Sequence, residues 1–177
     1  MAKAVIVIDV QRAFFEQEPL PANAEQTIDN INRVTVAARA ASVPVIFIYH
    51  ERPQNGLHAD SEPWQLQKDL VTDVDDRQVR KTTPDAFLDT DLQSQLTEIG
   101  ADQLVICGFA SEFCVDTTTR RAAGLGYRVE LVTDAHTTHD KAHATGEQIS
   151  LHHSNTLTSI ISFPQKVEAV TSKSVSF

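Results

Sequence analysis

Short apolar runs, each rich in Val, Ile and Leu, recur along this chain of 177 residues and are separated by stretches of helical periodicity. The runs are Ala4–Ile8, Val43–Tyr49, Leu104–Cys107 and Val129–Val132, with Val167–Val170 as a further candidate. Continuous apolar runs of this length are typical of strands that are buried on both faces of a parallel sheet. The fold must therefore supply helices that cover both faces of such a sheet.

Helical patterns lie between the apolar runs. One helix is expected after Asn23, which together with Gln26 resembles an N-terminal capping box. Further helices are expected over Leu92–Ile99, Glu112–Ala123 and Lys141–His153. Strands that alternate with helices are joined by right-handed crossovers, which predicts a three-layer α/β/α sandwich around a mainly parallel sheet. The length fits a single domain over residues 1–177.

The segment from His50 to Gln78 interrupts this alternation. It contains Pro53, Gly56 and Pro63 and has only weak periodicity. We expect a long loop that runs over the edge of the sheet. Long loops in compact domains often carry functional residues.

The charge and cysteine content exclude several classes of partner. The chain has 24 acidic and 15 basic residues, which gives a net charge of −9, and it has no basic cluster. Such a domain is a poor candidate for binding nucleic acid or an anionic membrane. No apolar stretch is long enough to cross a bilayer. Two cysteines do not make a disulfide scaffold, and residues 1–10 resemble a buried strand more than a signal peptide, so a cytoplasmic protein is expected.

Reactive side chains follow the ends of three predicted strands, and the carboxyl ends of parallel strands share one edge of the sheet. Asp9 ends the first strand, Asp134 ends the fourth, and Cys114 follows the third. If Ser111 is an N-cap, Cys114 is the third helical residue, where a helix N-terminus lowers the pKa of a thiol and can hold an oxyanion. A small buried side chain at Cys114 and a loop-anchoring carboxylate at Asp9 fit these positions as well.

Other polar residues and the single Trp are less informative. Lys81 lies in a short possible strand, and Cys107 fits a small buried side chain. His50 and His58 could bind a metal with one further ligand, but their spacing is not diagnostic. Trp64 could line a pocket or anchor the long loop. We interpret six histidines as polar groups of loops or of the surface: His50, His58, His136, His139, His152 and His153.

Four segments together resemble the isochorismatase-like cysteine hydrolases, a family that includes nicotinamidases and N-carbamoylsarcosine amidase. One segment alone would be a weak match, but four in the same order, spread over nearly the whole chain, are specific. The segments are Val7–Gln11 followed by Phe14 and Phe15, Lys81 ahead of Asp85–Phe87, Cys107–Thr118, and Leu131–Ala135.

The resemblance implies a parallel sheet flanked by helices and a catalytic triad of Asp9, Lys81 and Cys114. It also implies a cis peptide bond, which would lie between Ala110 and Ser111. In the family this turn directs the amides at the positions of Ala110 and Cys114 toward one point, which serves as the oxyanion hole.

The resemblance extends to substrate contacts, and here the chain also departs from the nicotinamidases. Contacts with substrate are expected at Phe14, Trp64 and Ser111, where Ser111 replaces the more usual Thr and keeps the hydroxyl group. The nicotinamidase metal site uses an Asp two residues before its first His. Ile48 occupies that position ahead of His50, so we expect no metal and no other cofactor.

The implied activity is hydrolysis of a small amide through a thioester on Cys114, in a homo-oligomer such as a dimer or tetramer. Two alternatives remain open at this point. Isochorismatases of this fold cleave a vinyl ether and do not need the cysteine. A non-catalytic, redox-responsive protein could instead use Cys114 as its sensor thiol, with Cys107 as the resolving cysteine.

Overall fold

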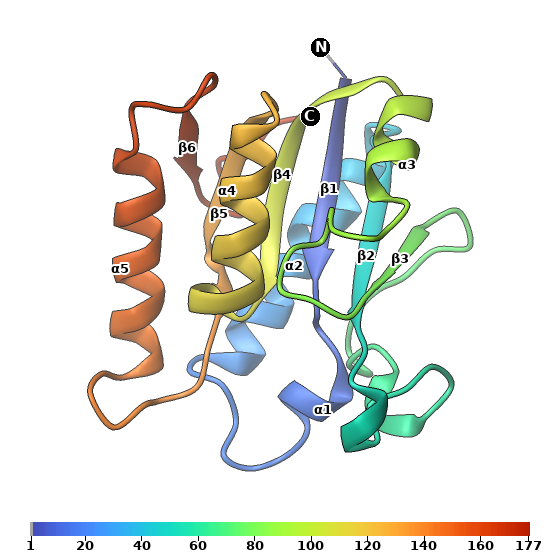
Figure 1. Cartoon of the computed structure of the whole chain (residues 1–177), viewed down its shortest axis with the longest axis vertical. Helices are drawn as coiled ribbons and strands as arrows, with labels where there is room; N and C mark the ends of the chain where they lie inside the picture. Colours follow the sequence, from blue (N-terminus) through green and yellow to red (C-terminus); the bar gives the residue numbers. More distant parts are fainter. Residues whose placement is uncertain (1) are drawn as a thin grey trace.

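The structure, a computed structural model, describes residues 2–177 and has a six-stranded sheet in the order β3-β2-β1-β4-β5-β6 (Figure 1). All five strand pairings are parallel, which confirms the predicted α/β class. Each predicted apolar run forms a strand, and the short segment that contains Lys81 adds one more. The strands are β1 Ala2–Ile8, β2 Val45–His50, β3 Arg77–Lys81, β4 Ala101–Phe109, β5 Arg128–Thr137 and β6 Val167–Val170.

Helices cover both faces of the sheet (Figure 1). They are α1 Arg12–Phe15, α2 Ala24–Ala40, α3 Leu92–Glu98, α4 Asp116–Gly124 and α5 Gly146–Ser159, together with the short turns η1 Pro53–Asn55, η2 Glu62–Trp64 and η3 Ser111–Val115. Alternate residues of a strand point to opposite faces. Val5 and Val7 of β1 accordingly pack in the core cluster on the α2 face, whereas Ile6 and Ile8 pack in the cluster beneath α3, α4 and α5.

One expected helix start and one expected helix cap differ from the sequence prediction. Helix α5 begins at Gly146 instead of Lys141, because Thr145 and Gln148 form a reciprocal capping box there. Asn23 does precede α2, but it has a left-handed φ of 51° and its side chain makes no capping bond. The cap geometry thus depends on the backbone angle at Asn23, which cannot be predicted from the residue types alone.

The long segment after β2 is a loop, as expected, apart from two single-turn 3₁₀ helices. An antiparallel bridge between Arg52 and Leu57 closes its first turn, and a second bridge joins Gln11 to Leu66. Trp64 stacks on Tyr49 with ring centroids 4.4 Å apart. This loop is therefore fixed to the ends of β1 and β2 instead of lying free over the sheet.

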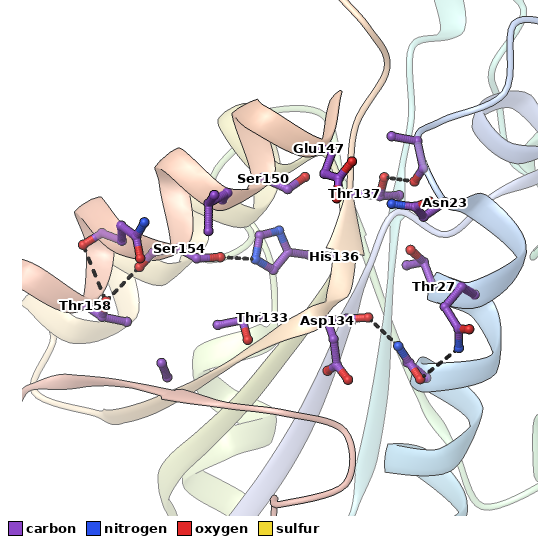
Figure 2. Close-up of a pocket in the computed structure, with 16 residues that line it drawn as sticks. Asn23, Thr27, Thr133, Asp134, His136, Thr137, Glu147, Ser150, Ser154 and Thr158 are labelled. Atoms are coloured by element: carbon purple, nitrogen blue, oxygen red, sulfur yellow. Dashed lines mark hydrogen bonds between the residues drawn. The ribbon is translucent and has the colours of Figure 1, made fainter. Parts of the chain in front are cut away.

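Strand β5 continues past the predicted end at Asp134, and its register against β4 shifts on the way. Ile106 pairs with Leu131, but Gly108 pairs with His136. Asp134 therefore lies inside β5, and its carboxylate accepts hydrogen bonds from the backbone and the hydroxyl of Ser172. A cavity of about 480 Å³ lies beside this irregularity, between α2, β5 and α5 (Figure 2).

Strands β1 and β4 approach each other closely where both end. Gly108 has a φ of +122°, and a Cβ atom at this position would lie 2.2 Å from the carbonyl oxygen of Ile8. Only glycine fits such an approach. The contact brings the residues that follow the two strands, Asp9 and Ala110, to the same edge of the sheet.

Within residues 2–177 no helix combines the length and apolar character that crossing a membrane requires.

Candidate active site

The side chains of Asp9, Lys81 and Cys114 meet at the carboxyl edge of the sheet. Asp9 follows β1, Lys81 is the last residue of β3, and Cys114 lies in η3 after β4. Lys81 Nζ donates a hydrogen bond to Asp9 Oδ2 at 2.7 Å and lies 3.2 Å from Cys114 Sγ. All three residues are buried, with exposed fractions of 1%, 2% and 7%. The structure thus brings together the three residues that the sequence singled out.

The turn that carries Cys114 begins one residue earlier than expected. The cis peptide bond lies between Phe109 and Ala110, so its predicted place between Ala110 and Ser111 is wrong. The cap of the turn is Ala110, not Ser111, and its carbonyl accepts hydrogen bonds from the amides of Phe113 and Val115. Because the extended backbone gives way to the turn at Ala110, both the cap and the cis bond precede the predicted positions by one residue. Cys114 is then the fourth residue of a π-helical turn.

Ser111 is fully buried, and its hydroxyl contacts side chains of β5 and α5. Its Oγ lies 2.8 Å from His136 Nδ1 and 2.8 Å from Ser150 Oγ. His136 Nε2 in turn lies 2.9 Å from Ser154 Oγ, a contact drawn in Figure 2. Burial lowers the pKa of His136 to about 4, so the ring is neutral at neutral pH. The interpretation of His136 as a loop or surface group is wrong, because β5 extends far enough to bury it.

The thiol and the carboxylate share a desolvated site with a single ammonium group. Burial raises the pKa of Asp9, and the Lys81 charge opposes that shift. Burial, followed by the Asp9 carboxylate, raises the pKa of Cys114 to about 12, again against the field of Lys81. The expected lowering of the Cys114 pKa by a helix terminus is therefore wrong. Lys81 carries one positive charge, which can balance one negative charge shared by the Asp9 carboxyl and the Cys114 thiol. Among the described residues Asp9 Oδ1 has no hydrogen-bond partner.

His50 and Arg52 extend this cluster. The interpretation of His50 as a loop or surface group is wrong, because it lies in a strand and is buried. His50 is the last residue of β2, and its Nδ1 lies 2.8 Å from Lys81 Nζ. Its Nε2 accepts a hydrogen bond from Arg52 Nε at 3.0 Å. Burial, then the charges of Lys81 and Arg52, lower the pKa of His50 to about 3. The sequence did contain one signal that places His50 at the site: it ends a buried strand, and the neighbouring strand is followed by Asp9.

Gln11 joins the long loop to the end of β2. Its Oε1 accepts a hydrogen bond from the His50 amide at 2.9 Å, and its Nε2 donates to the carbonyls of His50 and Trp64 at 3.1 and 2.9 Å. Gln11 is fully buried, so these bonds replace the water it would otherwise bind. Trp64 packs on Tyr49 beneath the loop, and Phe14 stacks on Phe109 at 5.1 Å.

The residues at this cluster do not fit a metal ion. One ligand atom each from Asp9, His50 and Cys114 lie within 4.8 Å of one another. The Lys81 ammonium, however, contacts all three, at 2.7, 2.8 and 3.2 Å, so a positive charge already stands among them. Ile48 is buried in the core, and His58 is exposed, with its Nδ1 3.0 Å from the carbonyl of Ala59.

The fold and the cluster together define a class: parallel α/β/α proteins that hold a thiol, a carboxylate and an ammonium group at one edge of the sheet. Residues 3–159 match the family model described as the isochorismatase domain. The chain belongs to the isochorismatase family.

Similar proteins include several named for hydrolytic activities. A streptothricin hydrolase of Streptomyces noursei is 35% identical over 145 residues, which are 81% of this chain and 58% of that protein. Nicotinamidase 3 of Arabidopsis thaliana is 34% identical, over 75% of this chain and 71% of the relative. A crystal structure of an isochorismatase family protein superimposes with a TM-score of 0.87 at 32% identity, covering 96% of this chain and 98% of the other. This chain spans about half the length of the streptothricin hydrolases that it matches, 58% of one and 50% of another.

Proposed function

We propose that this protein is a cysteine hydrolase that cleaves the acyl C–N bond of a small amide, with Asp9, Lys81 and Cys114 as its catalytic residues. The observation that carries the proposal is the position of Lys81 Nζ, in contact with both Asp9 Oδ2 and Cys114 Sγ inside a buried site. The names of the relatives, among them a nicotinamidase, support an amide substrate.

In the proposed mechanism the Cys114 thiol gives its proton to Asp9, whose Oδ1 has a free lone pair. The thiolate attacks the carbonyl carbon of the substrate, and the amides of Ala110 and Cys114 bind the oxyanion. Asp9 then passes the proton to the leaving amine, which leaves a thioester on Cys114. Water, deprotonated by Asp9, releases the acid and restores the thiol. Lys81 keeps one positive charge beside the negative charge as it moves between Asp9 and Cys114.

Of the three residues expected to contact the substrate, one is proposed to touch it and two to support the surrounding backbone. Phe14 stacks on Phe109, the residue before the turn of Cys114, and we propose it as a wall of the substrate pocket. Ser111, bonded to His136 and Ser150, supports the turn from behind. Trp64, stacked on Tyr49, holds the loop that would form the opposite wall. A homo-oligomeric state, a cytoplasmic location and a single domain stay predictions.

The two alternatives gain less support. A Cys107–Cys114 disulfide would have to cross the sheet, because Cys107 packs in the cluster on the α2 face and Cys114 in the cluster on the opposite face. Vinyl-ether cleavage needs no thiol and gives no role to the contact between Lys81 and Cys114.

A panel of small amides, ureides and carbamoyl compounds, assayed for release of ammonia, tests the proposal. The wild-type protein should turn over at least one of them, and Cys114→Ala should abolish that turnover. Cys107→Ala, the matched removal of the other thiol, should keep it, with circular dichroism to check the fold of both variants. Full activity in Cys114→Ala would reject a thioester mechanism.

A further inference from the structure

We propose that Arg52 is a specificity-determining residue that binds a carboxylate of the substrate, and that His50 positions it beside the thiol. This inference rests on the proposed function and names its substrate class. The substrates are small amides that carry a carboxylate near the bond to be cleaved.

Arg52 is held at its backbone and at one edge of its guanidinium group. Its amide donates to the carbonyl of Leu57 at 2.7 Å, and the Leu57 amide donates back at 3.2 Å, which closes the turn through Pro53–Asn55. Its Nε donates to Nε2 of His50, whose backbone is in turn bonded to the side chain of Gln11. An arginine fixed in this way loses little further freedom when it binds a ligand.

The outer end of the Arg52 guanidinium remains available. Within residues 2–177, no carboxylate lies within 4.0 Å of it. Its neighbour Glu51 pairs with Arg80 instead. Because Nε is engaged by His50, the two terminal nitrogens are left as a pair of parallel N–H donors, the arrangement that binds a carboxylate in bidentate fashion. The chain has a net charge of −9, so the molecule as a whole repels anions. An anionic substrate therefore needs a local positive charge, and the unpaired Arg52 supplies one.

A short chain of contacts connects Arg52 to the reacting sulfur. Arg52 Nε lies 3.0 Å from His50 Nε2, His50 Nδ1 lies 2.8 Å from Lys81 Nζ, and Lys81 Nζ lies 3.2 Å from Cys114 Sγ. Arg52 also lies near enough to Asp9 for its charge to oppose the rise in that residue's pKa. Only two side chains thus separate Arg52 from the thiol, so we expect a small substrate with its carbonyl carbon at Cys114 to bring its carboxylate to Arg52.

A pair of alkylating reagents tests this recognition without any substrate. Iodoacetate carries a carboxylate and iodoacetamide does not, and with either one the Cys114 thiolate forms an S–C bond while iodide leaves. Arg52→Gln should lower the ratio of the two alkylation rates at Cys114, iodoacetate over iodoacetamide, by about tenfold or more, the effect of losing a charged bidentate pair. Arg52→Lys, which keeps the charge and loses the fork, should give an intermediate ratio.

Arg80→Gln is the matched control, because it removes the same charge from an arginine that is paired with Glu51 away from the thiol. Its ratio should equal that of the wild type, and mass spectrometry of the Cys114 peptide separates this label from any on Cys107. An unchanged ratio in Arg52→Gln overturns the proposal. An equal loss with both reagents also overturns it, because Arg52 would then act only on the thiol.

Turnover gives a second, separate measurement. Succinamate and its methyl ester share the amide and differ in the carboxylate. Arg52→Gln should raise the KM for succinamate by about tenfold or more and leave the kinetics of the ester unchanged. If neither compound releases ammonia, the amidase proposal is in question, whereas the alkylation ratio still decides the role of Arg52. A loss of kcat/KM that is equal for both compounds rejects carboxylate recognition.

Discussion

At the scale of single residues, Lys81 organises the candidate site. Its ammonium contacts a carboxylate, a thiol and an imidazole, and the thiol and the carboxyl have raised pKa values because they are buried. Two acids beside one cation hold one proton between them, so they titrate as a pair. The proton is thus stored between the proposed base and the proposed nucleophile before any substrate arrives.

Substitutions on the two sides of Cys114 should change its thiol pKa in opposite directions. Asp9→Asn removes a negative charge that raises this pKa, so the pH midpoint of iodoacetamide labelling should fall. Lys81→Met removes the opposing cation, so the midpoint should rise. Both variants should lose amide turnover, since each lacks a proposed catalytic group.

Lys68→Met, which changes an exposed lysine, is the control for the loss of charge and should leave the labelling midpoint where it is in the wild type. A midpoint that moves in the same direction in Asp9→Asn and Lys81→Met would contradict the shared-proton arrangement.

The family resemblance indicated the three principal residues as a set, whereas the ends of the predicted strands alone pointed to the carboxylate and the thiol but not to the lysine. Neither indicated the contacts of His50, Ser111 or His136. The direction of the Ser111 hydroxyl depends on where the turn begins, and the burial of His136 depends on how far β5 runs past its apolar run. Both are set by packing between segments that are distant in sequence.

At the scale of elements, the carboxyl ends of β1 and β4 form the most constrained contact near the site. The parallel order and the strand positions could be predicted from the apolar runs, whose period and length are local properties. The register shift in β5 could not, because the residues between Leu131 and His136 look like a continuous strand followed by a loop. The start of α5 could not be read from the apolar pattern, although Thr145 and Gln148 do carry the capping signal.

Gly108→Ala should strongly destabilise the protein. A Cβ at this position lies 2.2 Å from the carbonyl oxygen of Ile8, and the φ of +122° disfavours any residue with a side chain. We expect a loss of more than ~2 kcal/mol in the free energy of unfolding, measured with urea.

Gly124→Ala supplies the comparison, because nothing lies within 4 Å of a Cβ there and the residue ends helix α4. It should be neutral or stabilising by up to ~1 kcal/mol. Similar stabilities for the two variants would mean that β1 and β4 do not approach each other as described.

At the scale of the whole molecule, charge and burial together predict a response to acid. His136 has a folded-state pKa of about 4, against an ordinary value of 6.5. Between these two values the unfolded chain binds a proton that the folded protein excludes, so stability is full above pH 6.5 and falls as the pH drops toward 4. His50, whose pKa is also lowered, reduces the stability of the fold in acid in the same way. Asp9, whose pKa is raised, has the opposite effect, because the folded state binds its proton more tightly.

His136→Asn should therefore reduce the dependence of stability on pH. Besides burial, two titratable groups act on the pKa of His136: His153 lowers it and Asp134 raises it. Urea unfolding at pH 7 and at pH 5 should show a drop in the wild type of up to ~1.4 kcal/mol per pH unit from this one residue, and a smaller drop in the variant. Equal drops would show that His136 does not exclude the proton.

The contact between Lys81 and Asp9 joins residues 72 positions apart, and it requires β3, β2 and β1 to lie side by side. Pairings between such distant segments form slowly during folding, because a large loop must close before any contact compensates for its lost entropy. A chain that has formed only its helices and local turns has a cysteine but no ammonium group beside it. The rate at which Cys114 is alkylated therefore reports the progress of refolding, since it reaches its native value only when the last of these strands has paired.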